Sequence, residues 1–285
     1  MQTRRIGDVE VSAIGLGGMP MSIEGRPDEA RSIATLHAAL DAGLTLIDTA
    51  DAYHRDADEV GHNETLIAKA LASHERGPDV LVATKGGHLR PGDGSWTLDG
   101  SPAHIKAACE ASLRRLGVEA IGLYQFHRPD PKVPYAESVG AVRELLDEGK
   151  IRLAGVSNAD PDQIRLANEI LGGRLVSVQN QFSPAFRSSE PELRLCDELG
   201  IAFLPWSPLG GISRAGDLGS AYAPFARVAA AHGVSPQRVC LAWMLAKSPV
   251  VVPIPGASRP ETIRDSAAAV DLVLSAEETA ELDAV

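Results

Sequence analysis

The chain has 285 residues, of which 44% are hydrophobic and 23% are charged, as in ordinary globular proteins. Lys and Arg number 27 against 38 Asp and Glu, which gives a formal net charge of −11. A surface with this charge repels phosphate backbones and anionic lipid, so nucleic-acid binding and membrane binding are not expected. The sequence has three widely spaced cysteines, no long apolar run and no signal-like amino terminus. These features predict reduced thiols and a cytoplasmic location.

Eight short apolar runs along the chain predict β-strands. Most of these runs are continuous rather than alternating, as expected for parallel strands that are covered on both faces. The run over 13–16 is the weakest of them. In chain order the predicted strands are 13–16, 44–48, 80–84, 121–126, 151–156, 175–178, 201–204 and 250–254.

The segments between these runs show the spacing of amphipathic helices. Glycine follows four of the segments directly, at Gly117, Gly149, Gly172 and Gly200, where a left-handed helix cap is favourable. The predicted helices are 28–42, 63–72, 101–116, 135–148, 161–171, 190–199, 223–232, 237–247 and 260–268.

Strand–helix units of about 36 residues are typical of a (β/α)8 barrel, and we expect a single such α/β domain over residues 1–285. The main alternative is a doubly wound open sheet, which normally carries a GxGxxG loop after its first strand. Here Gly15-Leu16-Gly17-Gly18 lacks that spacing. Two long irregular stretches, 86–100 and 210–222, follow predicted strands and are therefore expected at the functional end of the barrel.

Polar side chains stand at the carboxyl ends of consecutive predicted strands. Asp48 ends the second strand and Tyr53 follows it, while Lys85 ends the third strand and His127 follows the fourth. Each residue taken singly is more often structural than catalytic. Their joint arrival at equivalent strand ends predicts a common site on one rim of the barrel.

These four residues together suit proton transfer to a carbonyl oxygen. Lys85 would be buried in the barrel mouth and needs a counter-charge, which Asp48 on the neighbouring strand can supply. A nearby ammonium lowers the pKa of a tyrosine such as Tyr53, and a neutral His127 can donate a hydrogen bond to the same oxygen. His54 and His62 lack metal-ligand spacing, and we expect no metal site.

The chain resembles the aldo-keto reductase superfamily over essentially its whole length. The segment from Asp48 to Tyr53 is similar to that family's Asp-x-Ala-x-x-Tyr signature, and Asp48, Tyr53, Lys85 and His127 match its catalytic tetrad. The resemblance implies a (β/α)8 barrel that binds NADPH across its carboxyl end. It also implies reversible hydride transfer between the nicotinamide and a carbonyl carbon, with Tyr53 as the proton donor in reduction.

The resemblance also implies which residues hold the cofactor. Ser157, Asn158 and Gln179 match the carboxamide-binding positions, and Trp206 matches the aromatic residue that stacks on the nicotinamide. Arg259 and Ser258 stand where a helix begins and are the expected partners of the adenosine 2′-phosphate, so NADPH is expected rather than NADH. The remaining expected cofactor residues are Gly18 and Met19 beside the first strand, Ser207, Leu209 and Gly211 in the pyrophosphate loop, and Gly256, Thr262 and Asp265.

Substrate contacts are expected from His54, His88 and Trp96, which lie in loops at the same rim. The expected reaction is the NADPH-dependent reduction of a small aldehyde or ketone by a monomer or weak homo-oligomer. A barrel that binds NADP(H) as a redox sensor without turnover is a second reading. A Schiff-base aldolase that uses Lys85 is a third, although such a lysine needs a depressed pKa rather than a carboxylate partner.

Overall fold

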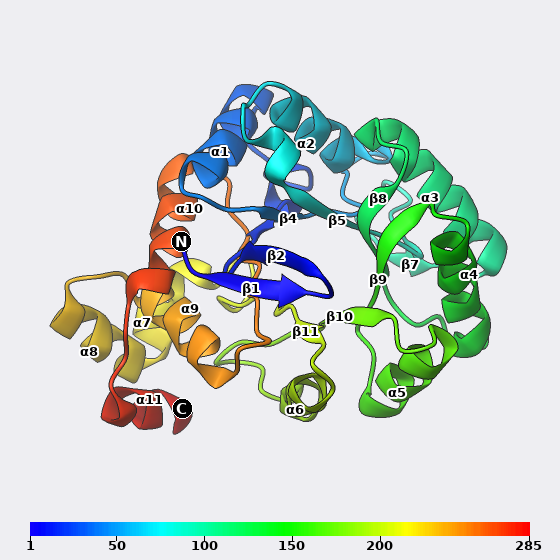
Figure 1. Cartoon of the computed structure of the whole chain (residues 1–285). Helices are drawn as coiled ribbons and strands as arrows, with labels where there is room; N and C mark the ends of the chain where they lie inside the picture. Colours follow the sequence, from blue (N-terminus) through cyan, green and yellow to red (C-terminus); the bar gives the residue numbers. More distant parts are fainter.

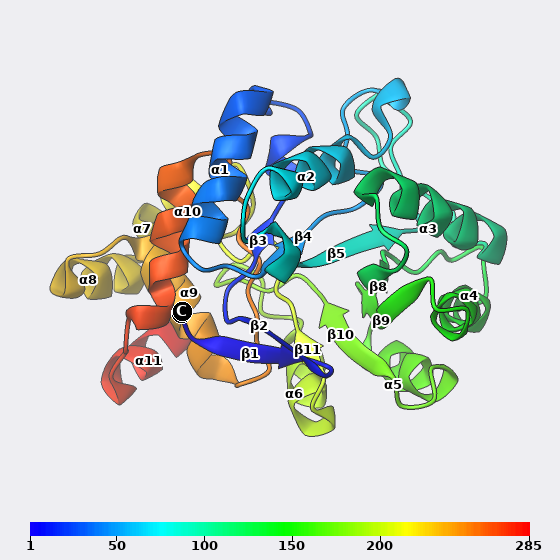
Figure 2. The ribbon, with the colours of Figure 1, turned by 45° about the horizontal axis from the view of Figure 1, so that its top comes forward.

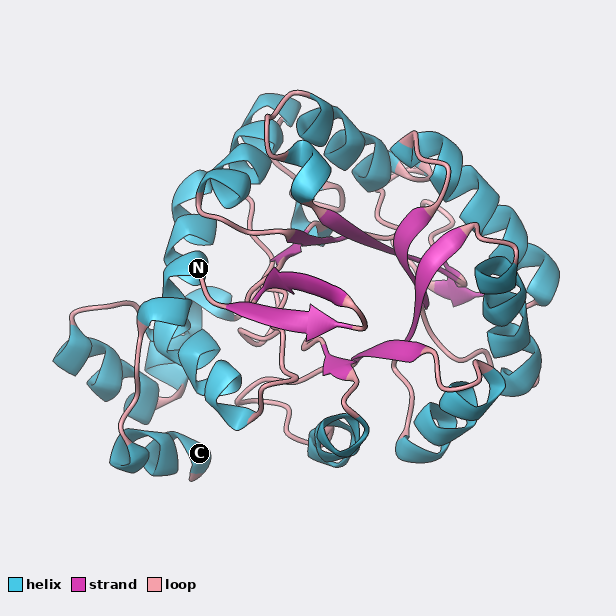
Figure 3. Cartoon of the chain, viewed as in Figure 1, coloured by secondary structure: helices cyan, strands magenta, loops and turns pink.

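The computed structural model describes residues 1–285 and contains one curled parallel sheet surrounded by helices (Figure 1). Seven strands follow one another in the order β11-β10-β9-β8-β5-β4-β3, and every neighbouring pair is parallel. Figure 3 shows the strands on the inside and the helices on the outside, which is the arrangement of a (β/α)8 barrel. The strands are β3 (Leu16–Gly17), β4 (Leu46–Asp48), β5 (Leu81–Gly86), β8 (Ile121–Phe126), β9 (Ile151–Ser157), β10 (Leu175–Gln179) and β11 (Ala202–Phe203).

The segment 250–256 takes the eighth place in the barrel. The sequence predicted a strand over 250–254, but this segment does not form a regular one. Val252 donates its N–H to Phe203 on one side, and Pro253 accepts the N–H of Gly15 on the other. Pro253 and Pro255 have no N–H to return to the β3 side, so only half of that ladder can form. Isolated bridges therefore close the barrel at this seam.

The predicted helices all form, with ends that differ from the prediction by no more than one residue, which is within the usual uncertainty of helix termini. Ser101 caps its helix by accepting the N–H of His104, and Gly117 ends that helix at φ 67°. Asp160 and Gln163 form a reciprocal capping box at the next helix but one. The helices are α1 (Glu29–Asp41), α2 (His62–Ala72), α3 (Pro102–Leu116), α4 (Tyr135–Asp147), α5 (Pro161–Ile170), α6 (Glu190–Leu199), α7 (Leu218–Ala221), α8 (Ala223–His232), α9 (Pro236–Lys247), α10 (Pro260–Ala267) and α11 (Ala276–Asp283).

A hairpin that the sequence analysis did not predict covers the amino end of the barrel. Strands β1 (Thr3–Ile6) and β2 (Val9–Ser12) pair antiparallel around Gly7, which has φ 60°. The buried side chains of Ile6 and Val11 pack among residues of the barrel interior. Figures 1 and 2 show this hairpin across the barrel opening. Because that end is covered, the site predicted at strand ends opens at the carboxyl end.

Four further strands and helices also lay outside the predicted set. Strands β6 (His88–Leu89) and β7 (Thr97–Leu98) form a short antiparallel hairpin within the stretch predicted as irregular. Helices α7 and α11 lie beside α8 and α9, outside the ring of helices (Figure 2). No helix in the chain is long and apolar enough to cross a membrane.

Candidate active site

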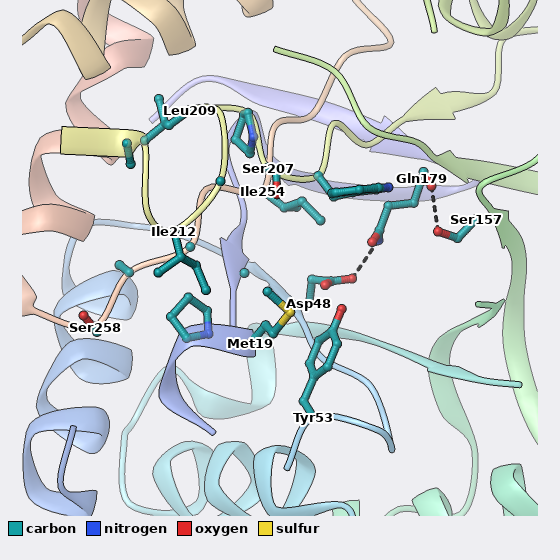
Figure 4. Close-up of a pocket in the computed structure, with 18 of the residues that line it drawn as sticks. Met19, Asp48, Tyr53, Ser157, Gln179, Ser207, Leu209, Ile212, Ile254 and Ser258 are labelled. Atoms are coloured by element: carbon teal, nitrogen blue, oxygen red, sulfur yellow. Dashed lines mark hydrogen bonds between the residues drawn. The ribbon is translucent and has the colours of Figure 1, made fainter. Parts of the chain in front are cut away.

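A cavity of about 790 Å³ opens at the carboxyl ends of the strands (Figure 4). It extends from the strand ends toward the amino end of α10, and it receives side chains from nearly every β-to-α loop. This is the place where active sites of the fold lie. The lining residues are Gly17, Met19, Pro20, Asp48, Tyr53, His88, Trp96, Leu98, His127, Arg128, Ser157, Asn158, Gln179, Trp206, Ser207, Pro208, Leu209, Gly211, Ile212, Ala215, Gly216, Ile254, Gly256, Ala257, Ser258, Arg259 and Thr262.

Lys85 lies below the floor of this cavity and is fully buried. Its Nζ donates to Asp48 Oδ2 at 2.7 Å, to the carbonyl of Thr49 at 2.7 Å and to the Tyr53 hydroxyl at 3.1 Å. An ammonium has three N–H donors, so every one of them has a partner. The ion pair with Asp48 offsets the cost of burying the charge, as the sequence analysis expected.

Burial and the neighbouring charges act in opposite directions on Tyr53 and Lys85. Burial raises the pKa of Tyr53 above its usual value, and the Lys85 ammonium opposes that rise without overcoming it. The sequence analysis expected the ammonium to lower this pKa, and that expectation was wrong. The free-energy cost of burying the phenolate is larger than the gain from its attraction to the ammonium. Burial alone would lower the pKa of Lys85, but Asp48 and Tyr53 together raise it. Near neutral pH the site therefore holds a protonated tyrosine beside a charged lysine.

His127 lies against Tyr53, with an edge-to-face contact of 5.9 Å between ring centroids. Burial, with help from the charge of Lys85, holds the pKa of His127 well below its usual range. The imidazole is therefore neutral, as expected from the sequence, and can donate one N–H to an oxygen in the cavity. Its Nδ1 has no partner within the protein.

The predicted carboxamide-binding residues form a hydrogen-bonded network that is joined to Asp48. Gln179 donates from Nε2 to Asp48 Oδ1 at 2.8 Å, and Ser157 donates from Oγ to the carbonyl of Gln179 at 2.7 Å (Figure 4). Asn158 donates to the carbonyl of His127 at 3.0 Å and accepts from Trp206 Nε1 at 3.2 Å. Asn158 has φ 57°, a left-handed conformation that an asparagine tolerates better than most residues. These contacts fix the amides next to the tetrad.

Most of the other predicted cofactor residues line the opposite part of the cavity. Figure 4 shows Ser207 and Leu209 in the loop after β11, facing Met19 across the cavity, with Ser258 farther along. Gly17 must be a glycine here, since a Cβ would lie 2.8 Å from the carbonyl oxygen of Ile254. Gly211, Gly256, Arg259 and Thr262 complete this part of the lining.

Three predicted site residues are not among those that line the cavity, and their roles in binding stay predictions. Gly18 is packed behind the cavity wall, where a Cβ would collide with Asn63 Oδ1, and Gly17 lines the cavity instead. The carboxylate of Asp265 accepts a hydrogen bond from Arg238 Nη2 at 2.6 Å and is not part of the cavity lining. His54 is buried outside the cavity, and its Nδ1 is hydrogen bonded to the carbonyl of Asp56 at 2.8 Å.

His88 and Trp96 do lie at the cavity, on the β6–β7 hairpin. Their ring centroids are 4.7 Å apart, and His88 also contacts the edge of His127 at 4.8 Å. The guanidinium of Arg90 lies 4.7 Å from the centre of the Trp96 ring, and this cation–π contact stabilises the position of the ring. The hairpin thus forms an aromatic wall directly beside the tetrad.

Several lining residues were missed by the sequence analysis. Arg128 follows His127 directly, and its position next to a predicted site residue was a usable signal. Ile212, Ala215 and Gly216 belong to the long stretch after β11, where sequence alone does not reveal which side chains turn inward.

The model of the aldo/keto reductase family matches residues 13–285. An uncharacterized oxidoreductase of Schizosaccharomyces pombe is 35% identical over 99% of this chain and 89% of its own. The glycerol dehydrogenase of Gluconobacter oxydans superposes with a TM-score of 0.83 at 28% identity, over 99% of this chain and 94% of its own. An aldo/keto reductase of Klebsiella pneumoniae, solved in complex with NADP and acetate, superposes with a TM-score of 0.82 at 31% identity, over the same shares of the two chains. The chain belongs to the aldo/keto reductase family.

Proposed function

We propose that the protein is an NADPH-dependent reductase of small aldehydes or ketones, with Asp48, Tyr53, Lys85 and His127 as its catalytic residues. The main support for this proposal is one contact at the cavity floor. There the fully buried, charge-paired Lys85 donates a hydrogen bond to the Tyr53 hydroxyl. Since the lining residues run from Gly17 to Thr262 of one chain, we infer that residues 1–285 act as one domain and that a monomer suffices for activity.

The residues around the cavity fit NADPH. Arg259 is exposed at the amino end of α10 and makes no ion pair with a carboxylate, so its guanidinium is available to a 2′-phosphate. The free N–H groups and dipole of the helix end favour an anion at the same place. At the other end, the Asn158 and Gln179 amides and the Ser157 hydroxyl offer both donors and acceptors to a carboxamide. When bound there, NADPH supplies the hydride that reduces the carbonyl carbon.

The protein's own groups supply the proton. Tyr53 is neutral near pH 7, so its O–H can donate to the carbonyl oxygen as that oxygen gains negative charge. Lys85, at 3.1 Å from the phenolic oxygen, stabilises the phenolate that remains. A neutral His127 donates a hydrogen bond that orients the same oxygen. The product is the alcohol, and Tyr53 recovers its proton from solvent.

The two alternative readings differ in what they require of Lys85 and of turnover. A Schiff-base lysine needs a free, neutral amine, whereas Lys85 has a raised pKa and no unused N–H. A redox-sensing barrel would bind the cofactor without consuming it in the presence of a carbonyl compound. An intact tetrad at the cavity floor favours turnover.

The test is NADPH oxidation, followed by its absorbance, across a panel of aldehydes and ketones. We expect turnover with at least one activated aldehyde, and a rate at least about a hundredfold lower with Tyr53→Phe. Cofactor binding without turnover on the whole panel would favour the redox sensor. Covalent trapping of a substrate on Lys85 by borohydride would favour the aldolase.

A further inference from the structure

Arg128 at the catalytic end of the cavity has no anionic partner. It lines the cavity directly after His127, and its only hydrogen bond within the protein runs from Nη2 to Asn158 Oδ1 at 3.1 Å. Two other arginines of low exposure, Arg90 and Arg115, are by contrast paired with Glu24 and Glu64. Arg128 makes no ion pair within 4.0 Å of any carboxylate.

No other group in the cavity balances this charge. The only carboxylate that lines the cavity is Asp48, whose two oxygens are already taken by Lys85 and Gln179. Burial, together with the charges of Arg128 and Lys85, lowers the pKa of His88 to about 4, so this wall residue is neutral. The catalytic end therefore carries one unbalanced positive charge in a chain whose net charge is −11.

We propose that Arg128 binds a carboxylate on the substrate, so that the enzyme prefers oxo acids, that is, aldehydes or ketones that also carry a carboxylate group. This inference rests on the proposed reductase function and names its substrate class. A guanidinium has five N–H donors in a planar fork that matches a carboxylate, and only one of them is used here. A single cation balances a single negative charge, which favours a carboxylate over a phosphate dianion.

The position of Arg128 suits this role. Its backbone is adjacent to that of His127, the residue proposed to orient the carbonyl oxygen, and His127 lies between Tyr53 and His88. A carboxylate held by Arg128 would therefore place the rest of a short substrate next to the tetrad. The competing role for Arg128 is to position Asn158, which also accepts from Trp206. That role would affect every substrate equally.

The experiment compares acids with their methyl esters, which have nearly the same shape but no charge. The pairs are 4-carboxybenzaldehyde with methyl 4-formylbenzoate, and succinic semialdehyde with methyl 4-oxobutanoate. For the wild type we expect a higher kcat/KM for at least one acid than for its ester. In Arg128→Gln we expect kcat/KM for that acid to fall about tenfold or more, mainly through KM, with a much smaller change for the ester. Arg128→Lys should restore part of the acid preference because it keeps the charge.

Control variants and binding measurements separate the outcomes. Arg152→Gln removes an exposed arginine near the start of β9, away from the cavity, and should leave both substrates unchanged. NADPH titration of Arg128→Gln should give a dissociation constant close to that of the wild type.

Equal losses for acid and ester in Arg128→Gln would show that Arg128 only positions Asn158 and would overturn the inference. A wild type that prefers every ester, or a variant that keeps the acid preference, would overturn it as well while leaving the proposed function intact. Failure of the wild type to oxidise NADPH with any carbonyl compound would instead overturn the proposed function, and this inference with it.

Discussion

At the catalytic end of the cavity, Lys85 is fully buried and all of its N–H donors have protein partners, whereas Arg259 at the other end is exposed and pairs with no carboxylate. Both residues carry a positive charge that the proposed function needs. The fold compensates the buried charge internally, because an unpaired ammonium without water would be very costly. The exposed charge of Arg259 is solvated by water, which costs little free energy and leaves the guanidinium free to bind a phosphate.

This difference predicts different sensitivities at the two ends. Interactions at the buried end act in a low dielectric and are already oriented, so removing one group should cost orders of magnitude in rate. Interactions at the exposed end are weaker and are screened by salt.

Tyr53→Phe removes the proposed proton donor at the buried end. We expect kcat for reduction to fall by about 10²- to 10⁴-fold, the usual contribution of general acid catalysis, while NADPH affinity stays close to that of the wild type. Steady-state kinetics and cofactor titration check both parts. Tyr222→Phe, which lies outside the cavity lining, is the matched control and should keep full activity. A folded Tyr53→Phe protein with wild-type kcat would remove the assignment.

Lys85→Met tests the internal compensation itself. We expect kcat to collapse, because nothing would then stabilise the Tyr53 phenolate, and stability to drop, because Asp48 would lose its buried partner. Asp48→Asn should be milder, since Lys85 keeps its contacts with Thr49 and Tyr53. Kinetics and denaturant unfolding of the two variants give the comparison. An Asp48→Asn protein that is more impaired than Lys85→Met would contradict this order.

Arg259→Ala tests the exposed end. A charge-assisted contact to a 2′-phosphate is worth about 1.5–3 kcal/mol, so we expect the dissociation constant of NADPH to rise at least about tenfold and that of NADH to change little. The effect should shrink at high ionic strength. Fluorescence titration of both cofactors measures it. Equal weakening of the two cofactors would mean that Arg259 supports the loop rather than the phosphate.

Asp51→Asn examines a buried carboxyl group that lacks such compensation. Its Oδ1 has no hydrogen-bond partner, and burial, together with the nearby Glu64, raises the pKa of Asp51 to about 8. The folded state therefore holds a proton that the unfolded state releases above about pH 4, so stability falls as the pH rises from about 4 to 8.

In the Asn variant this dependence disappears. Relative to the wild type, its free energy of unfolding should increase by about 1 kcal/mol or more between pH 5 and pH 8. Urea unfolding at several pH values checks this. Asp8→Asn, a control at an exposed position, should keep the pH dependence of stability that the wild type shows. A parallel pH dependence in Asp51→Asn and the wild type would mean that Asp51 is ionised in the fold.

Local patterns were sufficient for most of the barrel. Helix starts such as Ser101-Pro102 and stops such as Gly117 depend on a few neighbouring residues, so their positions could be predicted closely. The last predicted strand failed for the opposite reason. Residues 250–254 have the composition of a strand. However, Pro253 and Pro255 both lack a backbone N–H, and this limits the hydrogen-bond ladder at the barrel seam.

For the site, spacing along the chain was enough to bring Asp48, Tyr53, Lys85 and His127 to one rim, because the carboxyl ends of parallel strands necessarily meet there. Spacing could not say which neighbouring side chains face the cavity. His54 follows Tyr53 and was expected in the cavity, yet it is buried elsewhere, while Arg128 follows His127 and lines it. Loop side chains turn according to contacts with distant segments, such as Asn158 for Arg128. Those contacts exist only after the barrel has closed.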